Sequence, residues 1–280
     1  MLNRFLSTIA LWSMVFVTLY LFGVSGGFFI IILSSVGTQA ELYMLLKKMG
    51  YKPLIWIGLV IGLAMLVIPR FMFNPYNCFE VIISCLVISM MGMLLYIVAI
   101  GTPSSIQEVF IPTLFGVIYV PLMFSLPVVF IRYMEFICGS GIPALYMIIW
   151  MVAVAKFSDM GGLIVGSLIG RNKMSPCFSP NKTIEGLVGA IVFSVMVAVA
   201  TQPVIARKFE RFSMGRALII AMALSVIAVV GDLVESAMKR LANVKDSGKV
   251  VPGIGGILDL TDSLILALPM GVLLVNWLIL

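Results

Sequence analysis

The sequence predicts an all-α, polytopic membrane protein with about nine transmembrane helices and a polar site at the cytoplasmic face. Three observations lead to this prediction: 62% of the 280 residues are hydrophobic, only 11% are charged, and the mean hydropathy is +1.18. Average soluble domains are about 25% charged. Several apolar runs reach the roughly 20 residues that cross ~30 Å of hydrocarbon as a helix. The runs are continuous rather than alternating, which favours helices over a closed β-barrel.

Glycine- and proline-rich breaks, such as GVSGG at 23 and GSGIP at 139, separate the apolar runs. The predicted spans lie near residues 7–22, 25–42, 53–70, 80–100, 109–131, 142–165, 184–205, 214–235 and 263–280. The first run has no convincing small-residue cleavage site and is interpreted as an uncleaved span. We expect one integral-membrane domain over 1–280, with N-terminal helices in 1–140 and the motif-bearing helices and loops in 141–280.

Basic residues favour an orientation with the N-terminus inside, because positive charge is enriched in cytoplasmic loops. The segment 40–53, AELYMLLKKMGYKP, is amphipathic with a basic end and is expected at a membrane surface. The loop at 206–216, ARKFERFSMGR, puts four basic residues on the opposite side and argues against this orientation. The basic residues assigned to the inner face are Arg4, Lys47, Lys48, Lys52, Lys156, Arg171, Lys173, Lys182, Lys239, Arg240, Lys245 and Lys249.

Composition excludes several classes of chemistry. Histidine is absent, which removes histidine general bases, histidine metal ligands and Ser-His or Cys-His nucleophile systems. The four cysteines have no CxxC spacing and say little about redox compartment. The net charge of +6 fits cytoplasmic loops beside anionic lipid headgroups. Nucleic acid is not expected as a partner, because no separate basic domain is present.

Residues 231–263 concentrate charge of both signs in this otherwise apolar chain. If the eighth span continues as a helix, four polar side chains at i, i+3, i+4 and i+7 share one face: Asp232, Glu235, Ser236 and Lys239. A polar helix end with local ion pairs would also explain this row. Asp232, however, follows a long apolar run, and carboxylates within the membrane are costly and usually functional.

A glycine-rich loop with flanking charges follows in the same stretch. Lys245 and Asp246 precede PGIGG at 252–256, and Asp259 and Asp262 come after it. Mg²⁺ is commonly held by one or two carboxylates with substrate phosphates, lysines neutralise phosphate charge, and glycines let backbone N–H groups approach phosphate oxygens. These parts predict a metal-and-phosphate site. The spacing is not that of a P-loop, and a flexible loop is the alternative interpretation of PGIGG.

Two motifs resemble those of the phosphatidate cytidylyltransferases, also called CDP-diacylglycerol synthases. The first covers residues 231–262: Gly-Asp-Leu-x-Glu-Ser, with that Ser opening Ser-x-x-Lys-Arg, then Lys-Asp and Pro-Gly-x-Gly-Gly-x-x-Asp-x-x-Asp. The second lies in FSDMGGLIVGSLIGRNKMSPCFSPNKTIEG, residues 157–186. Its matching residues are Asp159, Gly161, Gly166, Gly170, Ser179, Pro180, Lys182, Thr183, Glu185 and Gly186.

The resemblance implies roles for individual residues. It implies metal binding by Asp232, Asp246 and Asp259, and neutralisation of phosphate charge in catalysis by Lys239, Arg240 and Lys245. It implies a substrate- or phosphate-binding set made of Ser179, Lys182, Thr183, Ser236, Gly253, Gly255 and Gly256. Asp159 is expected to be a further metal ligand or a structural carboxylate.

The chain departs from the family pattern at three places. Ile254 stands where the family usually has His, Leu260 where it usually has Arg, and Gly162-Leu163 where small and aromatic residues are usual. The first two departures remove a hydrogen-bond donor and a permanent cation from the expected site. Their effect on activity is open at the level of the sequence.

The resemblance implies a magnesium-dependent nucleotidyltransferase of phospholipid synthesis. It would transfer CMP from CTP to phosphatidic acid, forming CDP-diacylglycerol and pyrophosphate, among the lipids of a bacterial inner membrane with its site facing the cytoplasm. A second metal ion and a homodimer are left open, as are acyl-chain preference and the use of dCTP. The alternatives are an inactive relative and an ion-coupled transporter using Asp232 and Glu235. Polar residues gathered near one face, rather than at the midplane, favour the enzyme.

Overall fold

The computed structural model describes residues 2–72, 74–100, 102, 104–248, 250–251, 253 and 255–280, and their side chains except those of residues 2–9 and 100. The nine α-helices of the described residues are α1 (Leu2–Lys48), α2 (Ile55–Phe71), α3 (Cys78–Ile100), α4 (Ile111–Val117), α5 (Met123–Cys138), α6 (Ile142–Ile169), α7 (Ile184–Ala206), α8 (Met214–Leu241) and α9 (Ile257–Leu278). Short helical turns are η1 (Pro75–Asn77), η2 (Ile106–Phe110) and η3 (Ile118–Leu122). The described strands are β1 (Lys173–Ser175) and β2 (Ser179–Thr183), an antiparallel pair. The all-α prediction is confirmed.

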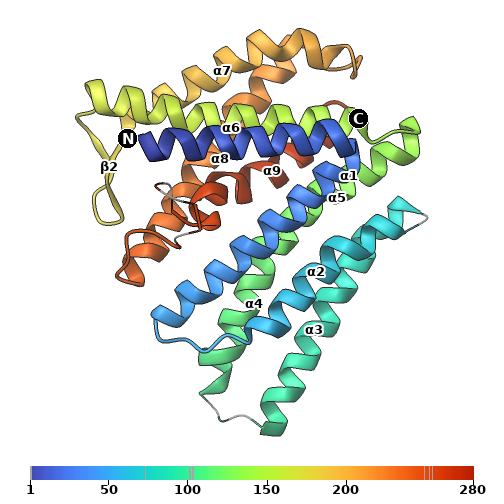
Figure 1. Ribbon diagram of the computed structural model, residues 1–280, viewed down its shortest axis with the longest axis vertical. Helices are drawn as coiled ribbons and strands as arrows, with labels where there is room; N and C mark the ends of the chain where they lie inside the picture. The colour runs from blue at the N-terminus through green and yellow to red at the C-terminus, as the bar shows by residue number, and fades with distance from the viewer. Residues whose placement is uncertain are drawn as a thin grey trace. The chain divides into compact units, whose positions relative to one another are not determined.

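Seven helices of the described chain are long and apolar enough to cross a membrane, so the count of nine spans is not confirmed. The predicted spans 7–22 and 25–42 both fall within α1, which changes direction at Gly23 (Figure 1, blue), where φ is 53° and ψ is −125°. The predicted span 53–70 corresponds to α2, which has only 17 residues. The polytopic membrane architecture itself is as predicted.

The chain separates into two compact units. The first contains the chain up to Ile142 together with Leu241–Thr261, and the second contains Pro143–Arg240 and Asp262–Leu280. The main division falls close to the predicted boundary between 1–140 and 141–280. The segment between α8 and α9, however, packs with the N-terminal helices. The single-domain interpretation stays a prediction.

The second half of α1 packs against α2 and α4 within the first unit. Tyr43 is fully buried, and its hydroxyl donates to the carbonyl of Thr113 (2.9 Å). Gly58 of α2 and Gly116 of α4 leave room for this side chain, because a Cβ at Gly58 would lie 2.1 Å from the Tyr43 hydroxyl and one at Gly116 would lie 2.2 Å from the Tyr43 ring. Gln39 donates to the carbonyl of Gly58 (2.9 Å). Two polar side chains and two glycines thus hold α1 against its neighbours.

In the second unit, α6 and α7 cross at glycines. A Cβ at Gly161 would lie 2.6 Å from the carbonyl oxygen of Gly189, and one at Gly186 would lie 2.9 Å from the carbonyl oxygen of Gly162. Three of these glycines belong to the stretch 157–186. These glycines let α6 and α7 pack closely. The hairpin of β1 and β2 joins these two helices, so their close packing fixes its position.

Candidate functional site

The polar row predicted on α8 is confirmed as helical, since α8 continues to Leu241. It crosses α9 closely at Gly231, where a Cβ would lie 2.5 Å from the carbonyl oxygen of Asp262 and 3.3 Å from the Cα of Ser263. The glycine in front of Asp232 therefore permits the contact between the helices. This contact brings Asp262 of α9 beside the acidic residues of α8.

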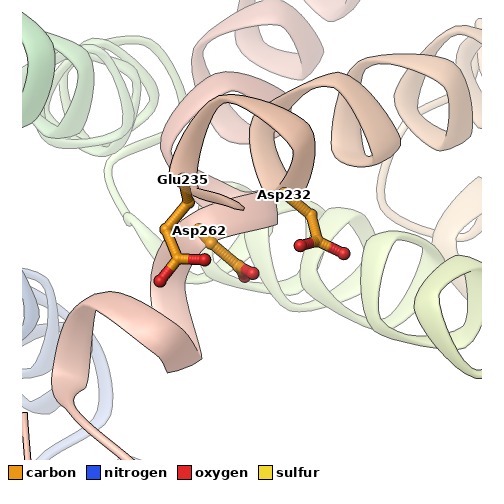
Figure 2. Close-up of side chains that lie close together, drawn as sticks. All are labelled: Asp232, Glu235 and Asp262. Atoms are coloured by element: carbon orange, nitrogen blue, oxygen red, sulfur yellow. The ribbon is translucent and has the colours of Figure 1, made fainter. Parts of the chain in front are cut away.

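Three carboxylates meet at this crossing: Asp232, Glu235 and Asp262, named here the acidic trio. One oxygen from each lies within 4.8 Å of the others. Figure 2 shows Asp232 and Glu235 projecting from one side of α8 toward the turn of α9 that carries Asp262. Oxygens that bind one Mg²⁺ at 2.0–2.1 Å lie at most about 4.2 Å apart. Small side-chain movements would therefore let the trio hold a divalent cation, and three carboxylates are the hard ligands that Mg²⁺ prefers.

Lysine ammonium groups pair with all three members of the acidic trio. Lys182 of β2 lies 2.7 Å from Asp232, and Lys239 pairs with Glu235, whose side chain is completely buried. Lys156 of α6 lies 3.8 Å from Asp262. Buried carboxylates need such partners, because an uncompensated charge in an apolar interior is strongly destabilising.

Lys156 also connects the trio to Asp159. Its ammonium lies 3.4 Å from Asp159 and donates to the hydroxyl of Ser263 (2.9 Å). The Ser263 hydroxyl in turn lies 2.9 Å from Asp159 Oδ2, and its backbone N–H donates to Asp262 (2.6 Å). Asp159 is thus a neighbour of the trio through Lys156 and Ser263, which leaves both predicted roles for it open.

Asp259 and a second carboxylate, Glu41 of α1, hold the segment in front of α9 within the first unit. Asp259 Oδ2 accepts from the backbone N–H groups of Gly256 (2.7 Å) and Ser247 (3.1 Å). Glu41 Oε2 accepts from the backbone N–H of Leu258 (2.8 Å). The Ser247 hydroxyl lies 3.0 Å from Glu41 Oε2 and 2.9 Å from Asp259 Oδ2. Asp259 therefore caps the start of α9; its predicted metal role stays a prediction.

The other residues predicted between α8 and α9 have varied environments. Lys245 and Asp246 are exposed, and Gly253 and Gly255 have φ angles of +80° and +135°. Ile254 lies outside the described residues. Leu260, the other departure, is half-buried in the first turns of α9.

The residues predicted at the hairpin and at the end of α8 mainly make local contacts. Thr183 is buried and caps α7 by accepting from the N–H of Gly186 (3.1 Å). Ser179 lies opposite Ser175 in the strand pair, and Arg240 donates to the carbonyl of Phe178 (3.3 Å). The Ser236 hydroxyl lies 3.4 Å from Asp232 Oδ1. Lys182 and Ser236 are thus the residues of the predicted binding set that contact Asp232 in the described chain.

Sequence reasoning gave no site role to Glu41 or Lys156. Each is a charged residue inside a long apolar helix. Charge in a membrane span is costly and usually functional, so the position of these residues in the sequence could have indicated a role. Glu235 and Asp262 were noticed in the motifs but were not assigned to the metal. Their grouping with Asp232 depends on the α8–α9 crossing, which spacing along the chain does not reveal.

Comparison with known proteins agrees with the motifs. The sequence model of the Cytidylyltransferase family matches residues 2–278. The chain is 41% identical over 128 residues to the phosphatidate cytidylyltransferase of Staphylococcus haemolyticus, covering 45% of this chain and 47% of that protein. The corresponding protein of Staphylococcus saprophyticus is 42% identical over 128 residues, and that of Staphylococcus aureus 38% over 128 residues, with the same shares of each chain. The match thus spans about half the length of these relatives.

The family match covers nearly all the described helices, including those that form the acidic trio and its lysines. The chain therefore belongs to the cytidylyltransferase family.

Proposed function

We propose that this protein transfers CMP from CTP to phosphatidic acid, forming CDP-diacylglycerol and pyrophosphate. The observation that carries the proposal is the acidic trio of Asp232, Glu235 and Asp262, with a lysine beside each member. Joining a nucleoside triphosphate to a lipid phosphate brings two polyanions together, and such a reaction needs positioning and charge neutralisation. The names of the relatives and the family motifs support the same reaction.

The proposed chemistry forms one bond and breaks one. A phosphate oxygen of phosphatidic acid bonds to the α-phosphorus of CTP, and the bond from that phosphorus to the bridging oxygen breaks, releasing pyrophosphate. A phosphomonoester is mostly dianionic at neutral pH, since its second pKa is near ~6. The nucleophile therefore needs no strong general base, which agrees with a chain that has no histidine.

The acidic trio would hold Mg²⁺, which when bound supplies positive charge to the phosphates. Lys182 and Lys239 pair with members of the trio here. Both ammonium groups are carried on flexible stems, so they can turn from the carboxylates to phosphate oxygens when metal and substrate are present. Lys156, held also by Asp159 and Ser263, would remain to keep Asp262 in place.

The remaining predicted residues complete the proposal. Arg240 and Lys245 would add cationic charge for phosphates, and Asp246 would serve a second metal ion. Ser179 and the glycines at 253 and 255 would contribute to substrate binding. We place the site at the cytoplasmic face of a bacterial inner membrane, where CTP arrives from the cytosol and phosphatidic acid from the bilayer.

The test is transfer of label from [α-³²P]CTP into lipid by the purified protein in detergent with phosphatidic acid and Mg²⁺. Label should enter the lipid with stoichiometric release of pyrophosphate. Asp262→Asn should abolish this transfer, whereas Glu108→Gln, which removes the exposed ion pair with Lys52 (2.8 Å), should not, because such surface pairs contribute little.

Two results would contradict the proposal. A normal rate in Asp262→Asn would remove the trio from the site. An inactive wild type whose activity appears only after Ile254→His and Leu260→Arg would make this chain an inactive relative of the family.

A further inference from the structure

Glu41 lies far from both family motifs in the sequence, yet within the first unit it contacts residues 247–258, which belong to the motif at 231–262. Its side chain is on α1 and the residue is only 2% exposed. One oxygen, Oε2, accepts from the hydroxyl of Ser247 (3.0 Å) and from the backbone N–H of Leu258 (2.8 Å). A single carboxylate therefore joins three parts of the chain: α1, the loop 242–256 and the start of α9.

Two glycines of the loop are shaped by this carboxylate. A Cβ at Gly256 would lie 2.0 Å from Glu41 Oε2, and a Cβ at Gly248 would lie 2.5 Å from Glu41 Oε1. Gly256 is not among the described glycines with positive φ, so its backbone does not demand glycine. The space taken by Glu41 and by the Ser247 hydroxyl, which would lie 2.4 Å from that Cβ, does demand it. This explanation is independent of the predicted role of the glycine in phosphate binding.

Asp259 of α9 binds the same part of the loop as Glu41. Its Oδ2 accepts from the backbone N–H groups of Gly256 and Ser247. Ser247 and Gly256 of the loop thus lie at two carboxylates, and the Ser247 hydroxyl contacts both of them. Two N–H groups at the start of α9, those of Gly256 and Leu258, are thus satisfied by protein carboxylates.

Burying the Glu41 carboxylate in α1 costs free energy. Its Oε1 is buried and accepts no hydrogen bond from the residues that the structure describes. A buried polar atom without a hydrogen bond costs free energy and calls for an explanation. An apolar residue would fill the same volume in α1 without this cost, but it could not bind the loop.

We propose that Glu41 is a positioning residue, which fixes the loop 242–256 and with it Lys245 and Asp246. Its effect on catalysis rests on the proposed cytidylyltransferase function, whereas its effect on the loop does not. Glu41 acts through Ser247, Gly256 and Leu258 and has no contact with the reacting groups in this proposal.

The test is a double-mutant cycle of Glu41→Ala and Gly256→Ala, with rates measured well below the unfolding temperature. Gly256→Ala alone should lower kcat by about 10-fold or more, because small displacements of catalytic groups cost up to about 100-fold. In the Glu41→Ala background the Cβ would still lie 2.4 Å from the Ser247 hydroxyl, but this hydroxyl can rotate once Glu41 is gone. The same change should therefore cost less than it does in the wild type, because the effects of residues in contact are not additive. Gly215→Ala on α8, where a Cβ meets nothing within 4 Å, is the matched control and should be neutral in both backgrounds.

Three further measurements separate positioning from general damage. Glu41→Ala should lower kcat with little change in the KM for phosphatidic acid. It should leave Mn²⁺ binding by the acidic trio unchanged, and it should speed hydrogen exchange at Leu258 and Ser247. Glu41→Gln, which keeps the shape and one acceptor oxygen, should recover part of the rate.

Equal costs of Gly256→Ala in both backgrounds would overturn the proposal and assign this glycine to the substrate. Loss of Mn²⁺ binding in Glu41→Ala would overturn it as well, because it would indicate disruption of the whole fold. If the wild type has no cytidylyltransferase activity, the proposed function fails. The hydrogen-exchange cycle, with amide protection in place of kcat, then still decides whether Glu41 holds the loop.

Discussion

Two groups of buried or half-buried carboxylates in the described residues differ in their partners. In the second unit, Asp232 and Glu235 of the acidic trio pair with lysine ammonium groups. In the first unit, Glu41 and Asp259 accept from backbone N–H groups and from the Ser247 hydroxyl. One group is neutralised by cations on flexible stems, and the other is bound by the polypeptide itself.

This difference separates carboxylates that can change partners from those that cannot. A lysine can move away when a metal ion arrives, because rotation of its stem leaves the backbone in place. A backbone N–H cannot be released without moving the loop that carries it. We therefore expect substitutions in the trio to affect ligand binding, and substitutions at Asp259 to affect the folded structure.

The largest effect on ligand binding is expected for Asp262→Asn. It removes one carboxylate of the trio while keeping the side-chain volume, so Mn²⁺ binding followed by electron paramagnetic resonance should weaken by more than about 100-fold, beyond the 10–100-fold typical of residues that only support a ligand. The thermal unfolding midpoint in detergent should change little. Wild-type Mn²⁺ affinity in this variant would contradict a metal site at the trio.

Lys239→Met should reduce stability most, because it leaves the completely buried Glu235 without its ammonium partner. Breaking a buried pair by removing one member costs about 3–5 kcal/mol. Chemical denaturation in mixed micelles measures the difference. Lys239→Arg keeps the positive charge and is the control; equal losses in the two variants would mean that packing, not charge, is responsible.

Asp259→Ala sharpens the comparison between the two groups. It leaves the N–H groups of Ser247 and Gly256 without this acceptor, and unsatisfied buried donors cost about 1–3 kcal/mol. We expect lower stability with unchanged Mn²⁺ affinity. Loss of Mn²⁺ affinity with normal stability would instead support the metal role that the sequence predicts for Asp259.

Gly231→Ala tests the α8–α9 crossing that assembles the trio. The new Cβ would lie 2.5 Å from the carbonyl oxygen of Asp262, and overpacking of this kind costs about 1–3 kcal/mol. Mn²⁺ affinity should fall in parallel, because the helices must move apart. A variant that loses stability but binds Mn²⁺ normally would show that the trio does not depend on this contact.

The smallest effect is expected for Thr183→Ala, which removes the cap of α7 at the N–H of Gly186. Loss of such a cap costs about 1 kcal/mol. Thr183→Ser keeps the hydroxyl and should retain most of the stability, as measured by thermal unfolding. If both variants keep their stability but bind CTP more weakly, Thr183 belongs to the substrate site rather than to the helix end.

The sequence was sufficient for the helical membrane architecture and for the polar face of α8, because both depend on local pattern. Asp232 and Glu235 share a face in any helix, and the structure confirms that the helix continues through them. The grouping with Asp262 depends on two helices crossing at Gly231. That crossing is a tertiary contact, and no spacing along the chain specifies it.

The contacts of Glu41 also could not be predicted from the sequence. In the sequence it is the one acid of the amphipathic segment 40–53, and it lies 206 residues from the Ser247 that it contacts. The glycine loop was interpreted as a place for phosphate because glycines often have that use. The structure adds a second reason for glycine at 256, because a Cβ there would meet the Glu41 carboxylate from a distant part of the chain; the phosphate role stays a prediction.

The break in α1 at Gly23 has a consequence for the topology of the whole chain. A straight helix of 47 residues would be about 70 Å long, more than twice the ~30 Å of a bilayer core. If α1 turns back at Gly23, its two halves cross the membrane twice between Leu2 and Lys48. If α1 continued straight, it would cross the membrane once. The number of crossings decides on which side of the membrane every later loop lies. The positive φ of Gly23 is a backbone conformation that glycine adopts readily, and a Cβ there would meet nothing within 4 Å. The conformation of this one residue therefore determines the membrane side of the loops that follow.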